Sequence, residues 1–339
     1  MPSNRSASAP SPLQTYEELM NFAWRGLALG AAVELDLFSH IASGNSDAEQ
    51  IAAAAGTSEA GTRRLLDALC GMGYLKKSAK RYRLSSTAAE YLVRTKPLYM
   101  GDAATIGTML TGSWSMLAEV VKSGRPFQAG ATAEERAAFF SKLVPAIFPP
   151  SFLSATAAVK RLPEAARRRI NRILDIGAGA AAWSIPFAKA LKRARVTVAD
   201  YPAVTQITRR YTERWGVADR FDYLEGDFRE VDFGTGFDLA ILGHIIHGEG
   251  PDWGKRLLRR IWEALGDGGM LLIGEFVPND ERSGPAWPLL FGLNMLINTP
   301  AGDVFTMREY REWLSEAGFR KVAALPAPEH VSPLILATK

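Results

Sequence analysis

The stretch Ile173–Ala190, ILDIGAGAAAWSIPFAKA, constrains the fold of this chain more than any other. It begins with an apolar run, passes through a turn with Gly177 and Gly179, and ends in an amphipathic segment with helical periodicity. A strand, a glycine turn and a helix hold a nucleotide-like ligand at the helix N-terminus, where backbone N–H groups face it. Asp175 gives the pattern D-x-G-x-G, and a carboxylate at the strand end suits a ligand with a positively charged part.

Beyond this turn, short apolar segments alternate with helical segments at the spacing of a doubly wound parallel sheet. The predicted strands are Arg195–Ala199, Phe221–Leu224, Phe237–Leu242 and Met270–Glu275. Acidic residues fall just past the strand ends, where ligands bind in such sheets. Asp200 is placed to accept the hydroxyls of a ribose. Asp227 is placed to hold an adenine edge, and Phe228 to stack against its face.

The overall composition is that of a globular chain with room for two domains, at 339 residues and 47% hydrophobic content. No apolar run reaches the roughly 18 residues that a membrane-spanning helix needs, so no membrane association is expected. Residues 1–12 are predicted to be a disordered tail rather than a signal peptide. The single cysteine, Cys70, excludes an intrachain disulfide and a cysteine-cluster metal site, which favours a cytoplasmic location.

Residues 13–110 show the order of a winged helix: helical segments followed by two short strands. We predict a short helix capped by Ser46, a stronger helix over Glu59–Met72, and strands at residues 74–77 and 81–84. A winged helix either binds DNA or is reused for protein–protein packing. The strong helix offers only Arg63 and Arg64 as basic residues, which favours packing. The basic run at residues 161–172 is typical of a solvated helix face, with a nucleic-acid patch as the alternative.

Residues 111–170 are predicted to be a helical linker that contributes to a substrate pocket. A helix that starts near Thr132 is expected to be interrupted by Pro145, Pro149 and Pro150. Four apolar side chains in or just before this part of the chain either line a pocket for an aromatic ligand or belong to the core. These are Met109, Trp114, Phe139 and Phe140.

The motifs ILDIGAG, ADYP, EGDF, HIIH and GDGGMLLIGE together resemble the S-adenosylmethionine-dependent small-molecule O-methyltransferases. That family includes caffeate, acetylserotonin and bacterial polyketide O-methyltransferases, and the resemblance covers nearly the whole chain. It implies an α/β fold, with a Rossmann-like class I methyltransferase domain over residues 171–339. It also implies an N-terminal α-helical winged-helix domain used for homodimerisation, a small-molecule methyl acceptor, and S-adenosyl-L-homocysteine as the product of the cofactor.

The resemblance also implies roles for individual residues. Asp175, Gly177 and Gly179 would hold the methionine part of the cofactor, Asp200 the ribose, and Asp227 with Phe228 the adenine. Further candidates for cofactor contact are Tyr201, Gly243 and His244. His247 matches the family's catalytic histidine, and Glu275 the carboxylate that orients it. Residues 287–298 resemble the helix that lines the acceptor pocket, with Phe291, Asn294, Met295 and Asn298 as substrate-binding candidates.

The proposed chemistry suits these residue types. A phenol with a pKa near 10 is poorly ionised at neutral pH, so a neutral imidazole is a suitable base. A carboxylate on its other nitrogen fixes the tautomer. The sequence shows no third and fourth ligand that would make His244 and His247 a metal site, so no metal is expected.

The chain departs from the family pattern at three places. Ala181 replaces the third glycine, the loop after His247 reads Gly248-Glu249, and Val304 stands where the family has a second carboxylate. His247 would then be supported by Glu275 alone, unless Asp303 or Glu249 substitutes. The alternatives are a C- or N-methyltransferase that acts by proximity, a DNA-binding regulator with a ligand-sensing domain, and an enzyme that uses the cofactor for a non-methylating reaction.

Overall fold

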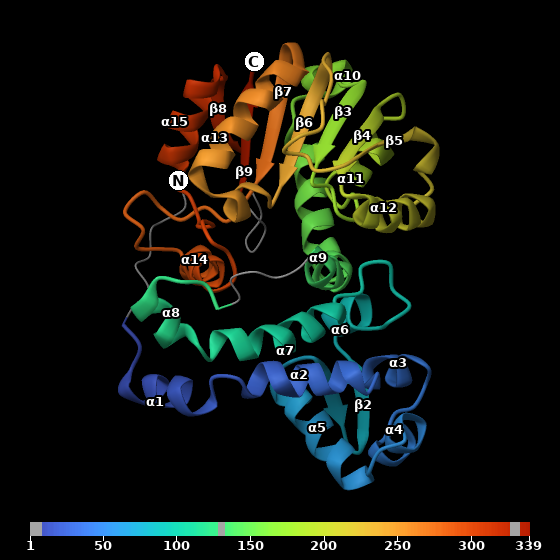
Figure 1. The fold of residues 1–339 in the computed structure, drawn as a ribbon. Coiled ribbons are helices and arrows are strands. Elements are labelled where there is room, and N and C mark those ends of the chain that lie inside the picture. The colour runs from blue at the N-terminus through green and yellow to red at the C-terminus, as the bar shows by residue number, and fades with distance from the viewer. Residues whose placement is uncertain (1–8, 128–132, 326–332) are drawn as a thin grey trace. The chain divides into compact units, whose positions relative to one another are not determined.

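A computed structural model of the chain describes residues 9–127, 133–325 and 333–339 (Figure 1). The chain divides into two compact units, one ending at Met109 and the other running from Leu110 to Lys339. Helix α7, Asp102–Trp114, crosses this boundary in the sequence. The second unit contains the complete sheet with the glycine turn.

The N-terminal unit consists of helices followed by a two-stranded antiparallel sheet, in the predicted order. Its core is formed by Leu66 and Leu69 of α5 packed with Tyr82 of the hairpin. The N-cap of α4 is Asp47, which accepts from the Gln50 amide, so the prediction of Ser46 as the cap was wrong by one residue. The elements are α1 Pro12–Asn21, α2 Trp24–Glu34, α3 Leu37–Ala42, α4 Ala48–Ala55, α5 Glu59–Gly71, β1 Leu75–Ser78, β2 Arg81–Leu84 and α6 Ser86–Tyr91.

The C-terminal unit is built around a seven-stranded sheet of order β5-β4-β3-β6-β7-β9-β8, as Figure 1 shows. The first five strands in this order run parallel, as expected for a doubly wound sheet. Strand β9 is antiparallel to both of its neighbours, β7 and β8. The strands are β3 Arg172–Ile176, β4 Arg195–Asp200, β5 Phe221–Glu225, β6 Phe237–Gly243, β7 Leu265–Gly274, β8 Arg320–Leu325 and β9 Leu334–Thr338. The carboxyl ends of the five parallel strands therefore meet at one edge of the sheet, where the candidate residues follow them.

Helices enclose this sheet and its apolar core. Helix α13 is kinked at Gly250, whose φ of 75° and ψ of 173° are not helical, and Pro251 follows the kink. The helices are α8 Leu117–Ser123, α9 Ala133–Arg161, α10 Glu164–Arg169, α11 Ser184–Ala190, α12 Pro202–Arg214, η1 Ala218–Arg220, α13 Ile246–Ala264, α14 Ala286–Asn298 and α15 Met307–Ala317.

Helix α9 runs without a break through Pro145, Pro149 and Pro150, so the expected interruption was wrong. The helix packs against α11 and α12, and its Phe148 ring lies 4.5 Å from the ring of Tyr211. This packing outweighs the hydrogen bonds that the prolines remove. The part Ala138–Arg161 is also long and apolar enough to cross a membrane, by length and composition only, and 56% of its apolar window is buried. A mostly buried core helix passes the same test.

Candidate active site

The turn after β3 brings the backbone of two strands together. Gly177 and Gly179 have φ values of 62° and 57°, in the left-handed region that favours glycine. The Gly177 amide donates to the Ala199 carbonyl over 2.9 Å, and the Gly179 amide to Asp200 Oδ2 over 2.9 Å. A side chain at Gly177 would collide with Ile245, which follows β6. The left-handed conformation therefore favours glycine at both positions, and the approach of Ile245 adds to this preference at Gly177.

Ala181, which stands at the third glycine position, is fully buried and has a φ of 56°. A left-handed conformation costs an L-residue with a side chain roughly 1–2 kcal/mol. The sequence indicated only a loss of backbone freedom at this position, whereas the structure shows that Ala181 is held in a conformation glycine would adopt readily.

We therefore expect Ala181→Gly to raise the free energy of unfolding by about 0.5 kcal/mol, because the strain that it relieves exceeds the entropy that glycine adds to the unfolded chain. The measurement is urea unfolding of both proteins. Ala182→Gly is the matched control, since Ala182 lies next in the same turn without a positive φ. The control should lose stability. Equal effects of the two changes would contradict the explanation.

Two buried carboxyl groups lie beneath this turn. Burial raises the pKa of Asp175 to about 7, and the charge of Asp200 adds to the shift. Burial likewise raises the pKa of Asp200 to about 6, although its oxygens accept hydrogen bonds from the amides of Gly179 and Tyr201. The hydroxyl and amide of Ser184 lie close enough to counter this rise in the pKa of Asp175, but within the described residues neither oxygen of Asp175 has a partner at full hydrogen-bond distance and angle. A buried carboxylate without a well-formed hydrogen bond fits a cationic ligand group, so these residues fit the cofactor that the motifs imply.

Asp227 and Phe228 follow β5, as predicted. Asp227 Oδ1 accepts from the Arg229 amide over 2.9 Å, and Arg229 pairs with Glu249. Phe228 is buried and belongs to the core of the unit. Tyr201, after β4, is 40% exposed, and its pKa is raised to about 12 by burial and by a hydrogen bond with Asp227. The residues predicted for the adenosine thus lie beside the carboxyl ends of β4 and β5.

A buried pair at this edge joins His247 of α13 to Glu275, which directly follows β7. His247 Nδ1 lies 2.8 Å from Glu275 Oε2, and the His247 amide donates to Glu275 Oε1 over 3.2 Å. Glu275 is almost completely buried. Burial would raise its pKa, but the two nearby histidines and the hydrogen bonds from His247 outweigh burial, so the pKa is lowered. Glu275 is therefore a buried anion that fixes the His247 ring.

Neither of the two possible substitutes for the family's second carboxylate forms a hydrogen bond or ion pair with the His247 ring in the described structure. Asp303 pairs with Arg282 over 3.6 Å, and its amide donates to the His247 carbonyl. Glu249 pairs with Arg229 over 2.9 Å. Val304 is buried and apolar. Among the described residues, Glu275 alone supports the imidazole.

His244 lies directly after β6 with a φ of 62°. Burial lowers its pKa to about 4, so the ring is neutral at physiological pH, and its Nδ1 lies 3.9 Å from Glu275 Oε2. One ligand atom each of His244, His247 and Glu275 falls within 4.8 Å of the others. Glu275 thus offers the third ligand atom that the sequence did not reveal. The hydrogen bond between His247 and Glu275 accounts for this arrangement without an ion.

The aromatic rings of Phe276 and Phe291 lie beside the two histidines. The Phe276 ring lies 4.6 Å from His244 and 4.1 Å from Phe291, and Phe291 meets His247 edge-on at 4.9 Å. Sequence reasoning named Phe291 as a substrate-binding candidate and did not name Phe276. Its signal is its position directly after Glu275, at the carboxyl end of β7.

The other predicted substrate residues are only partly brought together. The Trp114 Nε1 donates to Asn294 Oδ1, and Asn298 Nδ2 donates to the same oxygen. Met295 is buried. Phe140 is 41% exposed and packs edge-on against Phe139, and Met109 belongs to the N-terminal unit. Gly243 contacts the buried ring of Trp183, which leaves no room for a side chain there.

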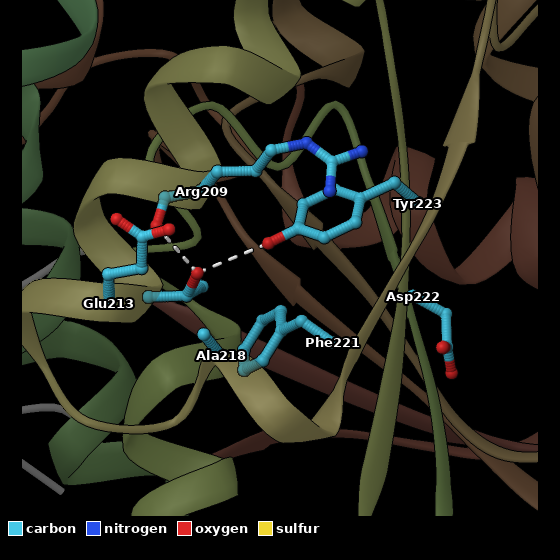
Figure 2. Close-up of a pocket in the computed structure, with 7 residues that line it drawn as sticks. Arg209, Glu213, Ala218, Phe221, Asp222 and Tyr223 are labelled. Carbon is cyan, nitrogen blue, oxygen red and sulfur yellow. Dashed lines mark hydrogen bonds between the residues drawn. The ribbon is translucent and has the colours of Figure 1, made fainter.

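A separate recess of about 500 Å³ lies at the outer edge of the sheet, between α12 and the start of β5 (Figure 2). Arg209 stacks over the Tyr223 ring, and the Tyr223 hydroxyl lies 3.1 Å from that of Thr212. The recess lies at the amino-terminal end of β5, whereas the predicted site residues follow the carboxyl ends of the strands. It therefore does not belong to the site.

Comparison with known families explains this arrangement. Residues 114–320 match the model of the O-methyltransferase domain, and residues 17–94 match the O-methyltransferase dimerisation domain. The first match alone covers more than half of the chain. The chain belongs to the O-methyltransferase family.

Relatives of this methyltransferase cover most of its length. A 3-hydroxy-5-methyl-1-naphthoate 3-O-methyltransferase of Streptomyces sahachiroi is 28% identical, over 90% of this chain and 89% of its own. A tetracenomycin polyketide synthesis 8-O-methyltransferase of Streptomyces glaucescens is 31% identical, over 87% and 88%. The crystal structure of human N-acetylserotonin methyltransferase with S-adenosylmethionine superposes with a TM-score of 0.82 at 25% identity, covering 98% of this chain and 99% of that one.

These findings confirm the expected fold and class of activity. The protein is an S-adenosylmethionine-dependent O-methyltransferase of the small-molecule type, with a Rossmann-like catalytic fold and an N-terminal dimerisation domain. They do not favour a C- or N-methyltransferase or a DNA-binding regulator.

Proposed function

We propose that this methyltransferase acts on a hydroxyl of an aromatic, polyketide-like metabolite, with His247 as the general base. The observation that carries this proposal is the pair of His247 and the buried anion Glu275, joined over 2.8 Å beside the rings of Phe276 and Phe291.

The contact between His247 and Glu275 determines which nitrogen of the imidazole carries the proton. Because Glu275 is ionised, it accepts a hydrogen bond from Nδ1–H of His247, which leaves the lone pair on Nε2. That nitrogen takes the proton of an acceptor hydroxyl, and Glu275 stabilises the imidazolium that results. When bound, the cofactor supplies an electrophilic methyl group on a sulfonium. The remaining task of the protein is to align the acceptor oxygen with that methyl group.

Different residues along the strand ends would hold different parts of the cofactor. Asp175 would receive the ammonium group, because its buried carboxyl has only Ser184 close by and no well-formed hydrogen bond in the described structure. Asp200 would accept the ribose hydroxyls, since each of its oxygens keeps a lone pair beyond the backbone bond it accepts. Asp227 and Phe228 would hold the adenine. Gly177, Gly179 and Gly243 keep side chains out of this space.

The acceptor class follows from the surface beside the base. Phe276 and Phe291 form a wall of tilted rings next to His247, which suits a flat aromatic molecule. The relatives named above act, by their names, on a naphthoate and on a tetracenomycin polyketide. Both are consistent with such a wall.

The test is incubation of the purified enzyme with S-adenosylmethionine and a panel of hydroxylated naphthalenes and anthraquinones. Mass spectrometry should detect a product that gains one methyl group together with S-adenosylhomocysteine, and NMR should place the methyl on oxygen. A product methylated on carbon or nitrogen would contradict the proposal.

We also propose that the enzyme is a homodimer. The first two helices and the link between them carry large apolar side chains that are exposed in the single chain, including Leu19 at 76%, Phe22 at 83% and Trp24 at 65%. They lie within the region that matches the dimerisation domain. A patch of this kind marks a protein interface.

Phe22→Glu is therefore expected to produce a monomer, because a charge at the centre of an apolar interface is costly to bury. Size-exclusion chromatography with light scattering measures the mass. Lys80→Glu, at the exposed hairpin, is the control and should stay dimeric. A monomeric wild type would show that the exposed patch has another purpose.

A further inference from the structure

The side-chain carbonyl of Asn294 accepts hydrogen bonds from two donors. Trp114 Nε1 donates to Asn294 Oδ1 over 3.0 Å, and Asn298 Nδ2 donates to the same oxygen over 3.1 Å. Asn298 Nδ2 also donates to the Asn294 backbone carbonyl over 2.9 Å. The three residues thus form a small network between the end of α7 and the last turns of α14.

The chemistry of the partners fixes which way the amide points. An indole nitrogen only donates, so the Asn294 atom that meets Trp114 must be the oxygen. The backbone carbonyl of Asn294 only accepts, so the Asn298 atom facing it must be the nitrogen. The usual ambiguity between the oxygen and nitrogen of an amide is therefore removed for both side chains.

The consequence is a fixed pair of N–H donors. Asn294 Nδ2 has no hydrogen-bond partner in residues 9–127, 133–325 and 333–339. The side chain is half-buried rather than buried. Asn294 lies three residues after Phe291, on the same face of α14, and the Phe291 ring meets His247 at 4.9 Å. The donors are thus presented about one helical turn from the residue that contacts the base.

We propose that Trp114 fixes which way the side-chain amide of Asn294 points, with the oxygen toward the indole. The acceptor pocket then selects molecules with a second, hydrogen-bond-accepting oxygen, such as a carbonyl or carboxylate. Trp114 is a positioning residue here, because it acts through Asn294. A ring substituent that only donates is rejected at this point, since Asn294 cannot turn its oxygen toward it without breaking both bonds. This inference rests on the proposed aromatic acceptor.

The test uses three probes that share one ring system and one hydroxyl. The probes are 3-hydroxy-1-naphthoate, 2-naphthol and 4-amino-2-naphthol, which carry an accepting group, no group and a donating group at the same position. Binding to the enzyme loaded with S-adenosylhomocysteine is measured by titration calorimetry under anaerobic conditions. We expect the carboxylate to bind about 10-fold or more tightly than 2-naphthol, and the amine to bind more weakly than both.

Three variants test the network itself. Asn294→Asp keeps the shape, but Trp114 and Asn298 then saturate one oxygen and leave the other as an acceptor. It should reverse the order of the carboxylate and the amine. Asn294→Leu should bind all three with similar affinity. Trp114→Phe keeps an aromatic ring but frees the amide to turn, and should lower the ratio between carboxylate and amine about 10-fold.

Trp262→Phe is the matched control, because Trp262 is a half-buried indole whose nitrogen has no partner in the described structure. It should leave the ratio unchanged. A loss of all affinities in parallel in Trp114→Phe would indicate a merely structural role and would overturn the proposal. So would a wild type that binds no probe, or that binds the three equally. Binding in the expected order without any methyl transfer would instead contradict the proposed function alone.

Discussion

Replacing His247 by glutamine is expected to lower turnover by about 10²–10⁴-fold on an unactivated phenol. The reason is that Glu275 holds the ring with its Nδ1–H, so His247 Nε2 is the base for the acceptor hydroxyl. Glutamine retains an N–H group for the buried Glu275, whereas alanine would leave that charge without its partner. Cofactor affinity, measured by calorimetry, should remain close to the wild-type value.

The same variant has a distinct dependence on the acceptor. Without a base, the acceptor must ionise by itself, so the variant's rate should rise with pH up to the phenol pKa near 10. Acidic phenols with nitro substituents should be methylated almost as fast as by the wild type. Single-turnover rates over a series of phenols measure this. If the variant lost activity equally on acidic and ordinary phenols, His247 would position the acceptor rather than deprotonate it.

The second large effect is expected at Asp175. Its pKa is raised to about 7 in the folded protein from an ordinary value of 3.8, so the folded state holds this proton more tightly than the unfolded state. The ligand-free enzyme should therefore lose stability as pH rises from about 4 to about 7. A shift of this size corresponds to at most about 4 kcal/mol. Asp175→Asn should remove much of that loss, and Asp200, whose pKa is raised to about 6, should account for a remaining part.

The affinity for the cofactor should rise with pH, whereas the stability of the ligand-free enzyme should fall. An ammonium group beside Asp175 favours the ionised carboxylate, so binding should release a proton below about pH 7, and affinity should rise with pH. Asp175→Asn is expected to weaken S-adenosylhomocysteine binding about 10- to 100-fold. Calorimetry in buffers of different ionisation enthalpy measures the released proton.

Asp222→Asn is the control for both effects, because Asp222 is an exposed residue paired with Arg195 at the far end of the sheet. It should change neither the pH dependence of stability nor cofactor affinity. An Asp175→Asn variant that binds the cofactor normally would assign the ammonium group to another residue.

The sequence predicted much of this protein because its signals are local. The apolar strands, the glycine turn and the acids after the strands are set by side-chain alternation and by backbone requirements that neighbouring residues impose. His247 and Glu275 were identified by their motifs, and both lie at the carboxyl edge of the sheet. The family follows from the same motifs.

The tertiary structure decided what depends on residues far apart in the chain. Packing against α11 and α12 keeps α9 helical through three prolines, which propensity alone would not allow. Phe276 joins the wall beside His247 only because β7 and α14 meet there. Asp303 and Glu249 are drawn away from His247 by Arg282 and Arg229.

The buried turn after β3 shows most clearly which features follow from the sequence and which depend on the tertiary structure. The sequence by itself predicted a turn at Gly177 and Gly179 shortly after Asp175, because glycine adopts this left-handed backbone without strain. Only the structure decided that Asp175 is buried without a well-formed hydrogen bond and that Trp114 fixes the direction of Asn294. Burial and hydrogen-bond polarity arise from contacts between segments up to 180 residues apart, which no local pattern encodes.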